Sequence, residues 1–132
     1  MMTTALLMID IQKSFTARDY WDEALVNPWA ISQRALIEAA RNAAIPIVRI
    51  FHEQPGSAGP FDPDKGLVCP LEGFSDEADA TFCKRVHNAF TDTGLQGWLD
   101  ERGINHIAVS GIRTEQCCET TARVGADLGF TV

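Results

Sequence analysis

Apolar residues gather in four short runs separated by longer segments of mixed polarity. These runs lie at residues 4–10, 45–51, 80–85 and 104–110. Short runs of this kind are typical of strands that are covered on both faces of a sheet. In residues 29–44 and 92–102, the apolar positions fall on one side of a helix instead. The alternation predicts a three-layer αβα sandwich with a mainly parallel sheet.

The ends of the predicted helices carry recognisable residues. Asn27 and Pro28 suit an N-cap and a first helical position, so the first helix is predicted to begin there. Gly103 suits the position just after the second helix. A third helix is predicted from about Glu115 toward Leu128.

A fifth strand is predicted to begin at residues 130–132. A chain that passes from a helix into a strand should be followed by enough residues to complete that strand. We therefore expect residues 1–132 to form a single domain that is incomplete at its C-terminal end, lacking a strand and a helix. Without them the sheet would have an exposed edge.

Residues 53–79 keep neither a strand nor a helix period. This stretch contains four prolines and four glycines. We expect a long surface loop, and loops of this length in compact domains are often functional. A flexible insertion without a role is the simpler alternative.

The charge balance is acidic. The chain has 11 Lys plus Arg against 18 Asp plus Glu, a net charge of −7, and no basic cluster. This argues against a nucleic-acid partner and an anionic membrane. No apolar run approaches the roughly 20 residues of a membrane span, and no positively charged signal-peptide start is present. We expect a cytoplasmic protein.

The four cysteines and three histidines show no spacing typical of metal ligands. We expect free thiols in a reducing compartment, no bound metal and no cofactor. The cysteines are Cys69, Cys83, Cys117 and Cys118, and the histidines are His52, His87 and His106.

Candidate chemistry follows the predicted strands at their carboxyl ends, where parallel sheets bind ligands. Asp10, His52 and Lys84 each follow a strand, and Cys117 lies in the first turn of the helix after the fourth strand. A helix N-terminus favours an anion, so a thiol there should ionise readily and act as a nucleophile. Its backbone amides could receive an oxyanion. Cys118 is rotated by about 100°, so only one of the two cysteines can face a site.

Each of these residues also has a simpler explanation. Cysteines are often small core residues, and a carboxylate or lysine at a strand end often only caps a turn or contacts solvent. The joint placement of an acid, an ammonium and a thiol at one edge favours a functional site.

Three segments resemble the isochorismatase-like cysteine hydrolases, which include nicotinamidases and N-carbamoylsarcosine amidase. They are LLMIDIQKSF, KRVHNAFTDTGL and GIRTEQCCETTARVGADLGFTV, in family order. The resemblance implies a catalytic triad of Asp10, Lys84 and Cys117. It also implies an oxyanion hole made by the backbone N–H groups of Arg113 and Cys117, with a non-proline cis peptide before Arg113.

The resemblance further implies a pocket for a small-molecule substrate. Phe15, His52 and Arg113 are the expected substrate-binding residues, and the guanidinium would suit an acidic substrate. Nicotinamidases carry an Asp-x-His metal motif after the second strand, whereas only His52 is present here. We therefore predict no metal site. Family members commonly form dimers or tetramers, so a homo-oligomer is expected.

The predicted function is a cysteine-dependent hydrolase that cleaves a small amide, carbamoyl or related C–N substrate through a Cys117 thioester. One alternative is an isochorismatase-type hydrolysis of a vinyl ether, with Asp10 as the acid. Another is a non-catalytic binding module on the same fold. A receiver-type phosphoacceptor domain is less favoured, because no acidic cluster surrounds Asp10.

Overall fold

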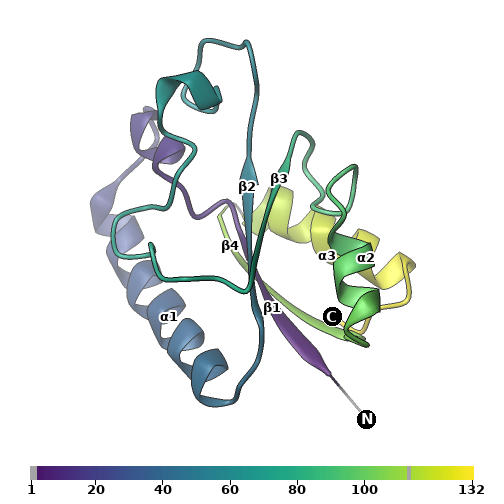
Figure 1. Cartoon of the computed structure of the whole chain (residues 1–132). Coiled ribbons are helices and arrows are strands. Elements are labelled where there is room, and N and C mark those ends of the chain that lie inside the picture. Colours follow the sequence, from purple (N-terminus) through teal and green to yellow (C-terminus); the bar gives the residue numbers. More distant parts are fainter. Residues whose placement is uncertain (1–2, 113) are drawn as a thin grey trace.

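The chain is built on a four-stranded parallel sheet (Figure 1). A computed structural model describes residues 3–112 and 114–132, apart from the side chains of residues 114 and 115. The strand order is β3-β2-β1-β4, and each neighbouring pair is parallel. The strands are β1 (Thr4–Ile9), β2 (Ile47–His52), β3 (Ala80–Lys84) and β4 (His106–Gly111). The four predicted strands are confirmed to within two residues at each end.

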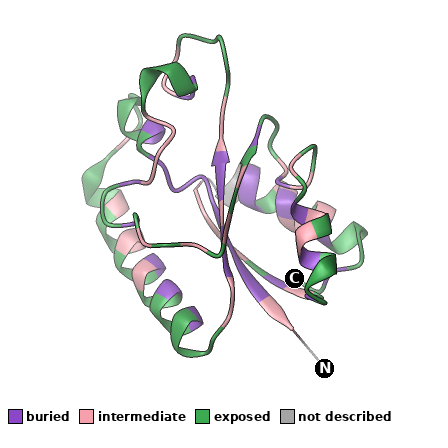
Figure 2. Cartoon of the chain, in the orientation of Figure 1, coloured by how far each residue is buried: buried purple, intermediate pink, exposed green. Residues whose placement is uncertain are grey.

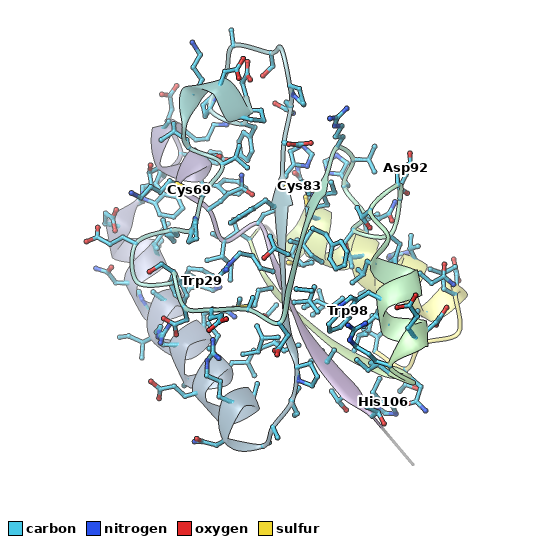
Figure 3. All side chains as sticks on the ribbon, viewed as in Figure 1. Trp29, Cys69, Cys83, Asp92, Trp98 and His106 are labelled. Atoms are coloured by element: carbon cyan, nitrogen blue, oxygen red, sulfur yellow. The ribbon has the colours of Figure 1, made fainter. Side chains whose placement is uncertain are left out.

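Helices cover both faces of the sheet. Figure 1 shows α1 (Glu23–Asn42) on one side and α2 (Leu95–Glu101) with α3 (Glu119–Asp127) on the other. Trp29 of α1 and Trp98 of α2 accordingly lie on opposite sides of the strands (Figure 3). The predicted three-layer sandwich is therefore confirmed. The shorter helical elements are η1 (Lys13–Ala17), η2 (Pro63–Lys65) and the π-helical η3 (Thr114–Cys118).

The central strand β1 is buried on both faces (Figure 2). Leu6 and Met8 pack in the core beneath α1, whereas Leu7 and Ile9 pack in the core beneath α2 and α3. Successive side chains of a strand point to opposite faces, so two covered faces require apolar residues at every position. This explains why the run in the sequence is continuous rather than alternating.

The first helix begins earlier than the sequence predicts. Asp22, not Asn27, is the N-cap, and its carboxylate accepts a hydrogen bond of 2.9 Å from the Ala24 N–H. Pro28 lies inside the helix, where it removes one backbone hydrogen bond. Trp29 packs against Phe74 with ring centroids 5.5 Å apart. The cap and this packing extend the helix across a residue that was predicted to start it.

The starts of the other two helices also differ from the prediction. The second starts at Leu95 after Gly94, and Gly103 follows its end with φ +65°, as expected. The third begins as a π-helical turn, Thr114–Cys118, and becomes α-helical only at Glu119. Turns of this kind are often found at functional sites.

The segment 53–79 is more than a surface loop. It buries three apolar side chains, Phe61, Leu71 and Phe74, which are 5%, 7% and 4% exposed. Leu71 and Phe74 join the core beneath α1. These isolated residues have no regular spacing, so periodicity could not reveal their burial.

The chain ends beside β4. Thr131 forms one parallel bridge to His106, and its carbonyl accepts a 2.8 Å hydrogen bond from the Ile107 N–H. The predicted fifth strand is thus present as a single bridge. That residues 1–132 form one incomplete domain stays a prediction.

None of the helices in the described part of the chain combines the length and apolarity required to cross a bilayer. The cytoplasmic location stays a prediction.

Candidate functional site

Three groups that are far apart in the sequence meet at the carboxyl edge of the sheet. The Lys84 ammonium donates hydrogen bonds to Asp10 Oδ2 at 3.2 Å and to Cys117 Sγ at 3.3 Å. Its Nζ atom also lies 3.0 Å from His52 Nδ1. All four side chains follow strands or the turn after β4, as the sequence predicts. A lysine ammonium has three N–H donors, and three acceptors surround this one.

A close approach of two backbones brings the cysteine turn to Asp10. Gly111 pairs with Ile9, the residue before Asp10, and the Ile112 N–H donates to the Ile9 carbonyl at 2.9 Å. A Cβ atom at Gly111 would lie 2.0 Å from the Ile9 carbonyl oxygen, and the φ angle of Gly111 is +138°. Only glycine fits this position, because any other residue would separate the strand end from Asp10.

The Asp10 carboxylate is held rigidly and is almost fully buried. Its φ of +57° lies in the left-handed region, and its N–H donates to the Ile50 carbonyl at 2.8 Å. Oδ2 is bound by Lys84, whereas Oδ1 has no hydrogen-bond partner among the described residues. Buried carboxylate oxygens normally have partners. Oδ1 is therefore an acceptor available to a reacting group.

Burial sets the acidity of this carboxyl. Desolvation raises the pKa of Asp10 above its usual 3.8, and the Lys84 ammonium opposes the shift without cancelling it. A carboxylate with a raised pKa is a stronger base once ionised. Asp10 is thus better suited to take and return a proton than an exposed aspartate.

The Cys117 thiol is less acidic than the sequence predicts. Burial, followed by the charge of the Asp10 carboxylate, raises its pKa from 9.0 to about 11, although Lys84 acts in the opposite direction. The prediction of a readily ionised thiol is therefore wrong for the resting site. Burial and the neighbouring carboxylate both disfavour the thiolate, and they outweigh the backbone dipole on which the prediction rested.

His52 is a neutral neighbour of the lysine. Burial and the Lys84 charge lower its pKa from 6.5 to about 4. Because the ammonium can only donate, Nδ1 is the ring nitrogen that carries the lone pair and accepts from Lys84. His52 also faces the pocket, where the sequence analysis expects it.

Gln12 fixes the position of His52. The side-chain amide accepts from the His52 N–H at 2.8 Å and donates to the His52 carbonyl at 2.9 Å. It also donates to Ser14 Oγ at 2.9 Å, and Gln12 is fully buried. Gln12 was not predicted from the sequence. Its polar side chain directly after an apolar strand was the available signal.

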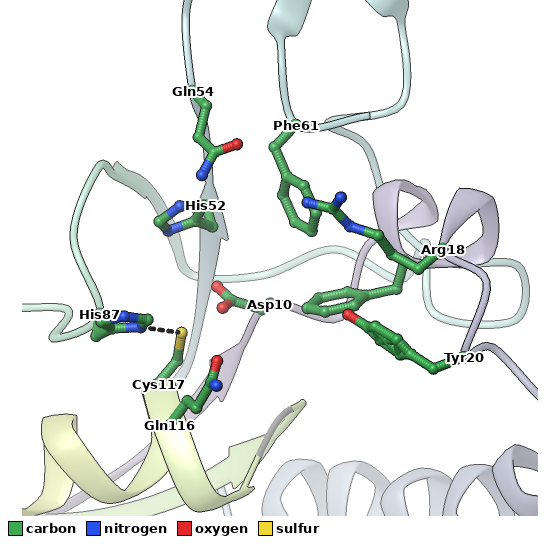
Figure 4. Close-up of a pocket in the computed structure, with 10 residues that line it drawn as sticks. Asp10, Arg18, Tyr20, His52, Gln54, Phe61, His87, Gln116 and Cys117 are labelled. Carbon is green, nitrogen blue, oxygen red and sulfur yellow. Dashed lines mark hydrogen bonds between the residues drawn. The ribbon is translucent and has the colours of Figure 1, made fainter. Parts of the chain in front are cut away.

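A pocket of about 130 Å³ opens above this cluster (Figure 4). Phe15 and Phe61 form one wall, with ring centroids 5.1 Å apart and planes at 86°. The expected pocket residues Phe15 and His52 both line it, together with Asp10 and Cys117. Besides Phe61, five further lining residues were not predicted from the sequence: Arg18, Tyr20, Gln54, His87 and Gln116.

Among these five, His87 has a recognisable position in the sequence. It lies three residues after Lys84, and its Nδ1 atom is 3.6 Å from Cys117 Sγ (Figure 4). Gln116 lies in the π-helical turn next to Cys117. Arg18, Tyr20 and Gln54 reach the pocket through irregular segments whose path a sequence pattern does not predict.

The two adjacent cysteines face different surroundings, as predicted. Cys117 lines the pocket, whereas Cys118 lines a separate apolar groove beside β4. None of the four cysteines forms a disulfide within the described residues.

Some expectations fall outside the described residues. They are the two roles of Arg113, in the oxyanion hole and in substrate binding, and the cis peptide before it. Within residues 3–112 and 114–132, no three histidine, cysteine or acidic side chains gather in a way that could hold a metal ion.

The fold and site together define a parallel α/β protein with a carboxylate, an ammonium and a thiol gathered at one edge of its sheet. Residues 4–132 match the isochorismatase domain family. The chain belongs to this family, which confirms the resemblance read from the three sequence segments.

Individual relatives agree with this assignment. The chain is 33% identical to YddQ, an uncharacterized isochorismatase family protein of Bacillus subtilis (strain 168), over 98% of this chain and 73% of that protein. It is 28% identical to Nicotinamidase 3 of Arabidopsis thaliana, over 97% of this chain and 68% of that protein. It also superposes on a cysteine hydrolase from Pseudomonas syringae pv. phaseolicola 1448A with a TM-score of 0.77 and 26% identity, covering 96% of this chain and 67% of that chain.

The chain is shorter than these relatives. It spans 73%, 68% and 67% of their lengths, and 62% of another matched structure.

Proposed function

We propose that this chain is a cysteine hydrolase that cleaves a small amide, carbamoyl or related C–N substrate through a thioester on Cys117. The observation that supports this most directly is the contact of one buried ammonium with both a carboxylate and a thiol, at 3.2 and 3.3 Å, beneath an open pocket. The names of two relatives, a nicotinamidase and a cysteine hydrolase, point to the same chemistry.

In the first half of the reaction, Asp10 takes the proton of the Cys117 thiol. The sulfur attacks the substrate carbonyl carbon, an S–C bond forms, and the carbonyl oxygen becomes an oxyanion. When this intermediate collapses, the C–N bond breaks, and the leaving nitrogen takes the proton that Asp10 holds. The products of this half are a thioester on Cys117 and a free amine or ammonia.

In the second half, water attacks the thioester and gives a proton to Asp10. The S–C bond breaks, the acid product leaves, and the proton returns from Asp10 to sulfur. Lys84 stays charged throughout and holds both groups in place. The raised pKa values of Asp10 and Cys117 suit this exchange, because the resting proton lies on sulfur while the base waits beside it.

The test combines turnover with detection of the thioester. The protein is incubated with a panel of small amides, ureas and carbamoyl acids, ammonia or amine release is followed, and acylated Cys117 is sought by mass spectrometry. Replacing Cys117 with Ala should lower turnover by about a thousandfold or more and remove the acyl adduct.

Cys118→Ala is the matched control, because it removes the adjacent thiol from the other side of the turn. It should leave the adduct in place. Unchanged turnover in Cys117→Ala would contradict the thioester mechanism, and no turnover of any panel member by the unmodified protein would favour the binding-module alternative.

A second candidate is hydrolysis of a vinyl ether with Asp10 as the acid. The raised pKa of Asp10 favours it, since a protonated carboxyl donates more readily near neutral pH. This reaction needs no thiol nucleophile. A Cys117→Ala protein that keeps its turnover of a vinyl ether, while Asp10→Asn loses it, would support this candidate over the amidase.

A further inference from the structure

The pocket has a positively charged mouth in a protein whose overall charge is negative. The chain carries a net charge of −7. Among the described residues that line the pocket, however, the only carboxylate is Asp10, and Lys84 already pairs with it. Arg18 adds a permanent cation to the lining. The pocket is therefore electrostatically complementary to an anion, although the net negative charge of the whole chain disfavours anion binding.

Arg18 is held at this mouth by stacking on an aromatic ring. The guanidinium carbon lies 5.0 Å from the centroid of Phe61, whose own ring meets Phe15 edge-on. A stacked guanidinium keeps its planar N–H groups free at the edge. In the view of Figure 4, it lies across the pocket from Cys117, with Asp10 between them.

The protein does not supply a carboxylate to Arg18 within residues 3–112 and 116–132. Two acidic residues of the segment after β2 are engaged elsewhere. Glu53 pairs with Arg85 at 3.1 Å, and Asp62 accepts the backbone N–H groups of Ala58 and Asp64 at 3.0 and 3.1 Å. An anion that pairs with the exposed Arg18 guanidinium would therefore come from a ligand.

We propose that Arg18 binds a carboxylate of the substrate, so that the preferred substrates are small amides that carry a carboxylate away from the scissile carbonyl. The flat or apolar middle of such a molecule would lie against Phe15 and Phe61, and its carbonyl would lie at Cys117. A planar guanidinium matches a planar carboxylate through two parallel hydrogen bonds. This assignment rests on the proposed amidase function, because it takes Cys117 as the reacting end.

The first test measures binding without turnover. Succinamate and butyramide have the same four-carbon chain and the same amide, but only succinamate ends in a carboxylate. Calorimetry on the Cys117→Ala protein should show succinamate binding about tenfold more tightly than butyramide or better. Arg18→Met, which keeps an apolar stem over Phe61, should remove this preference.

Arg102→Met is the matched control. Arg102 also stacks on an aromatic ring, 4.0 Å from the centroid of Trp98, but it does not line the pocket. The substitution removes the same charge and the same kind of contact, and it should leave the preference for succinamate unchanged. Equal binding of the two probes, or a preference that survives Arg18→Met, would overturn the assignment.

The second test uses two alkylating reagents that differ only in charge. The rate of Cys117 modification by iodoacetate is divided by the rate with iodoacetamide, so that the ionisation of the thiol cancels. Arg18→Met should lower this ratio by about fivefold or more, and Arg102→Met should not change it. An unchanged ratio in Arg18→Met would contradict carboxylate binding by Arg18, even if Cys117 forms a thioester. If no thioester forms but the preference for a carboxylate is clear, only the amidase mechanism would be contradicted.

Discussion

The floor and the mouth of the pocket are built in contrasting ways. The floor consists of Asp10, Lys84 and Cys117, which are 1%, 1% and 7% exposed and are joined through one ammonium. The mouth includes Arg18 and Tyr20, which are exposed and come from the irregular segment before α1. Strand ends and a glycine fix the floor, whereas a single aromatic stack orients Arg18. The contrast suggests that the floor determines the reaction and the mouth determines which molecules enter.

The largest effect is expected from Asp10→Asn in the floor. Asparagine tolerates the left-handed φ of +57° at this position, so the backbone should keep its shape. The base is lost, however, and kcat/KM should fall by about a thousandfold. Steady-state turnover of the best amide measures this, with the thermal midpoint as the folding control.

The same variant separates the electrostatic effect of the Asp10 carboxylate on Cys117 from the role of Asp10 as a base. The Asp10 carboxylate helps to raise the pKa of Cys117 to about 11, so its removal should lower that pKa. The midpoint of the pH profile of alkylation should therefore move downward although turnover is lost.

In the unmodified protein, the acid limb of kcat/KM should be centred above 3.8, because burial raises the pKa of Asp10. An acid limb at or below that value would contradict a base role for Asp10.

Lys84→Met should cost the next largest amount. Removing one member of a buried ion pair leaves the other uncompensated, at a cost of about 3–5 kcal/mol in the free energy of unfolding. Without Lys84, the pKa of Asp10 rises further in the folded state, while the unfolded chain keeps the usual 3.8. The loss should therefore be full at neutral pH and should shrink as the pH falls toward 3.8.

Urea unfolding at several pH values measures this loss. Arg85→Met is the control, because it breaks the more exposed ion pair with Glu53. That change should cost no more than about 1 kcal/mol. Similar costs for the two variants would mean that the buried pair contributes no more to the free energy of unfolding than the exposed pair does.

Gln12→Ala should have a smaller effect. It removes the amide that binds both backbone groups of His52 and leaves them without these partners. The expected cost is about 1–3 kcal/mol in urea unfolding, with a lower kcat/KM because His52 and Lys84 lose their support. Gln54→Ala, an exposed change at the mouth, should alter stability by about 0.5 kcal/mol or less. If both variants behaved alike, the supporting role of Gln12 would be wrong.

Phe61→Leu should have the smallest effect on the reaction. It removes the ring that meets Phe15 and His52 edge-on and carries Arg18, and none of these three residues belongs to the floor. We expect KM to rise by about three- to tenfold with kcat nearly unchanged, because aromatic contacts contribute about 0.5–1.5 kcal/mol each. A fall in kcat with unchanged KM would contradict the division between floor and mouth.

The floor was largely predictable from the sequence. Asp10 and Lys84 stand at the ends of apolar strands, and the carboxyl ends of parallel strands share one edge. Gly111 marked the turn that delivers Cys117. What the sequence could not supply was the balance of burial against charge, and the pKa of the Cys117 thiol was for that reason predicted in the wrong direction.

The mouth was much less predictable. Arg18 lies in a segment without a regular period, and Phe61 reaches the pocket through the irregular loop after β2. Their positions depend on the path of the whole chain rather than on a local repeat. The start of α1 was missed for a related reason, because Pro28 is a stronger signal in the sequence than Asp22, which is the actual cap. The oligomeric state, the cytoplasmic location and the absence of a cofactor stay predictions.

The position of the Lys84 ammonium between its two acidic neighbours has a consequence for the energetics of the reaction. Nζ lies 3.2 Å from Asp10 Oδ2 and 3.3 Å from Cys117 Sγ, so it is nearly equidistant from them. Whether the negative charge resides on oxygen or on sulfur, its attraction to Nζ is almost the same. The lysine therefore favours neither atom, so the preference of the resting proton for sulfur comes from burial and from the Asp10 charge, which raise the pKa of Cys117 to about 11.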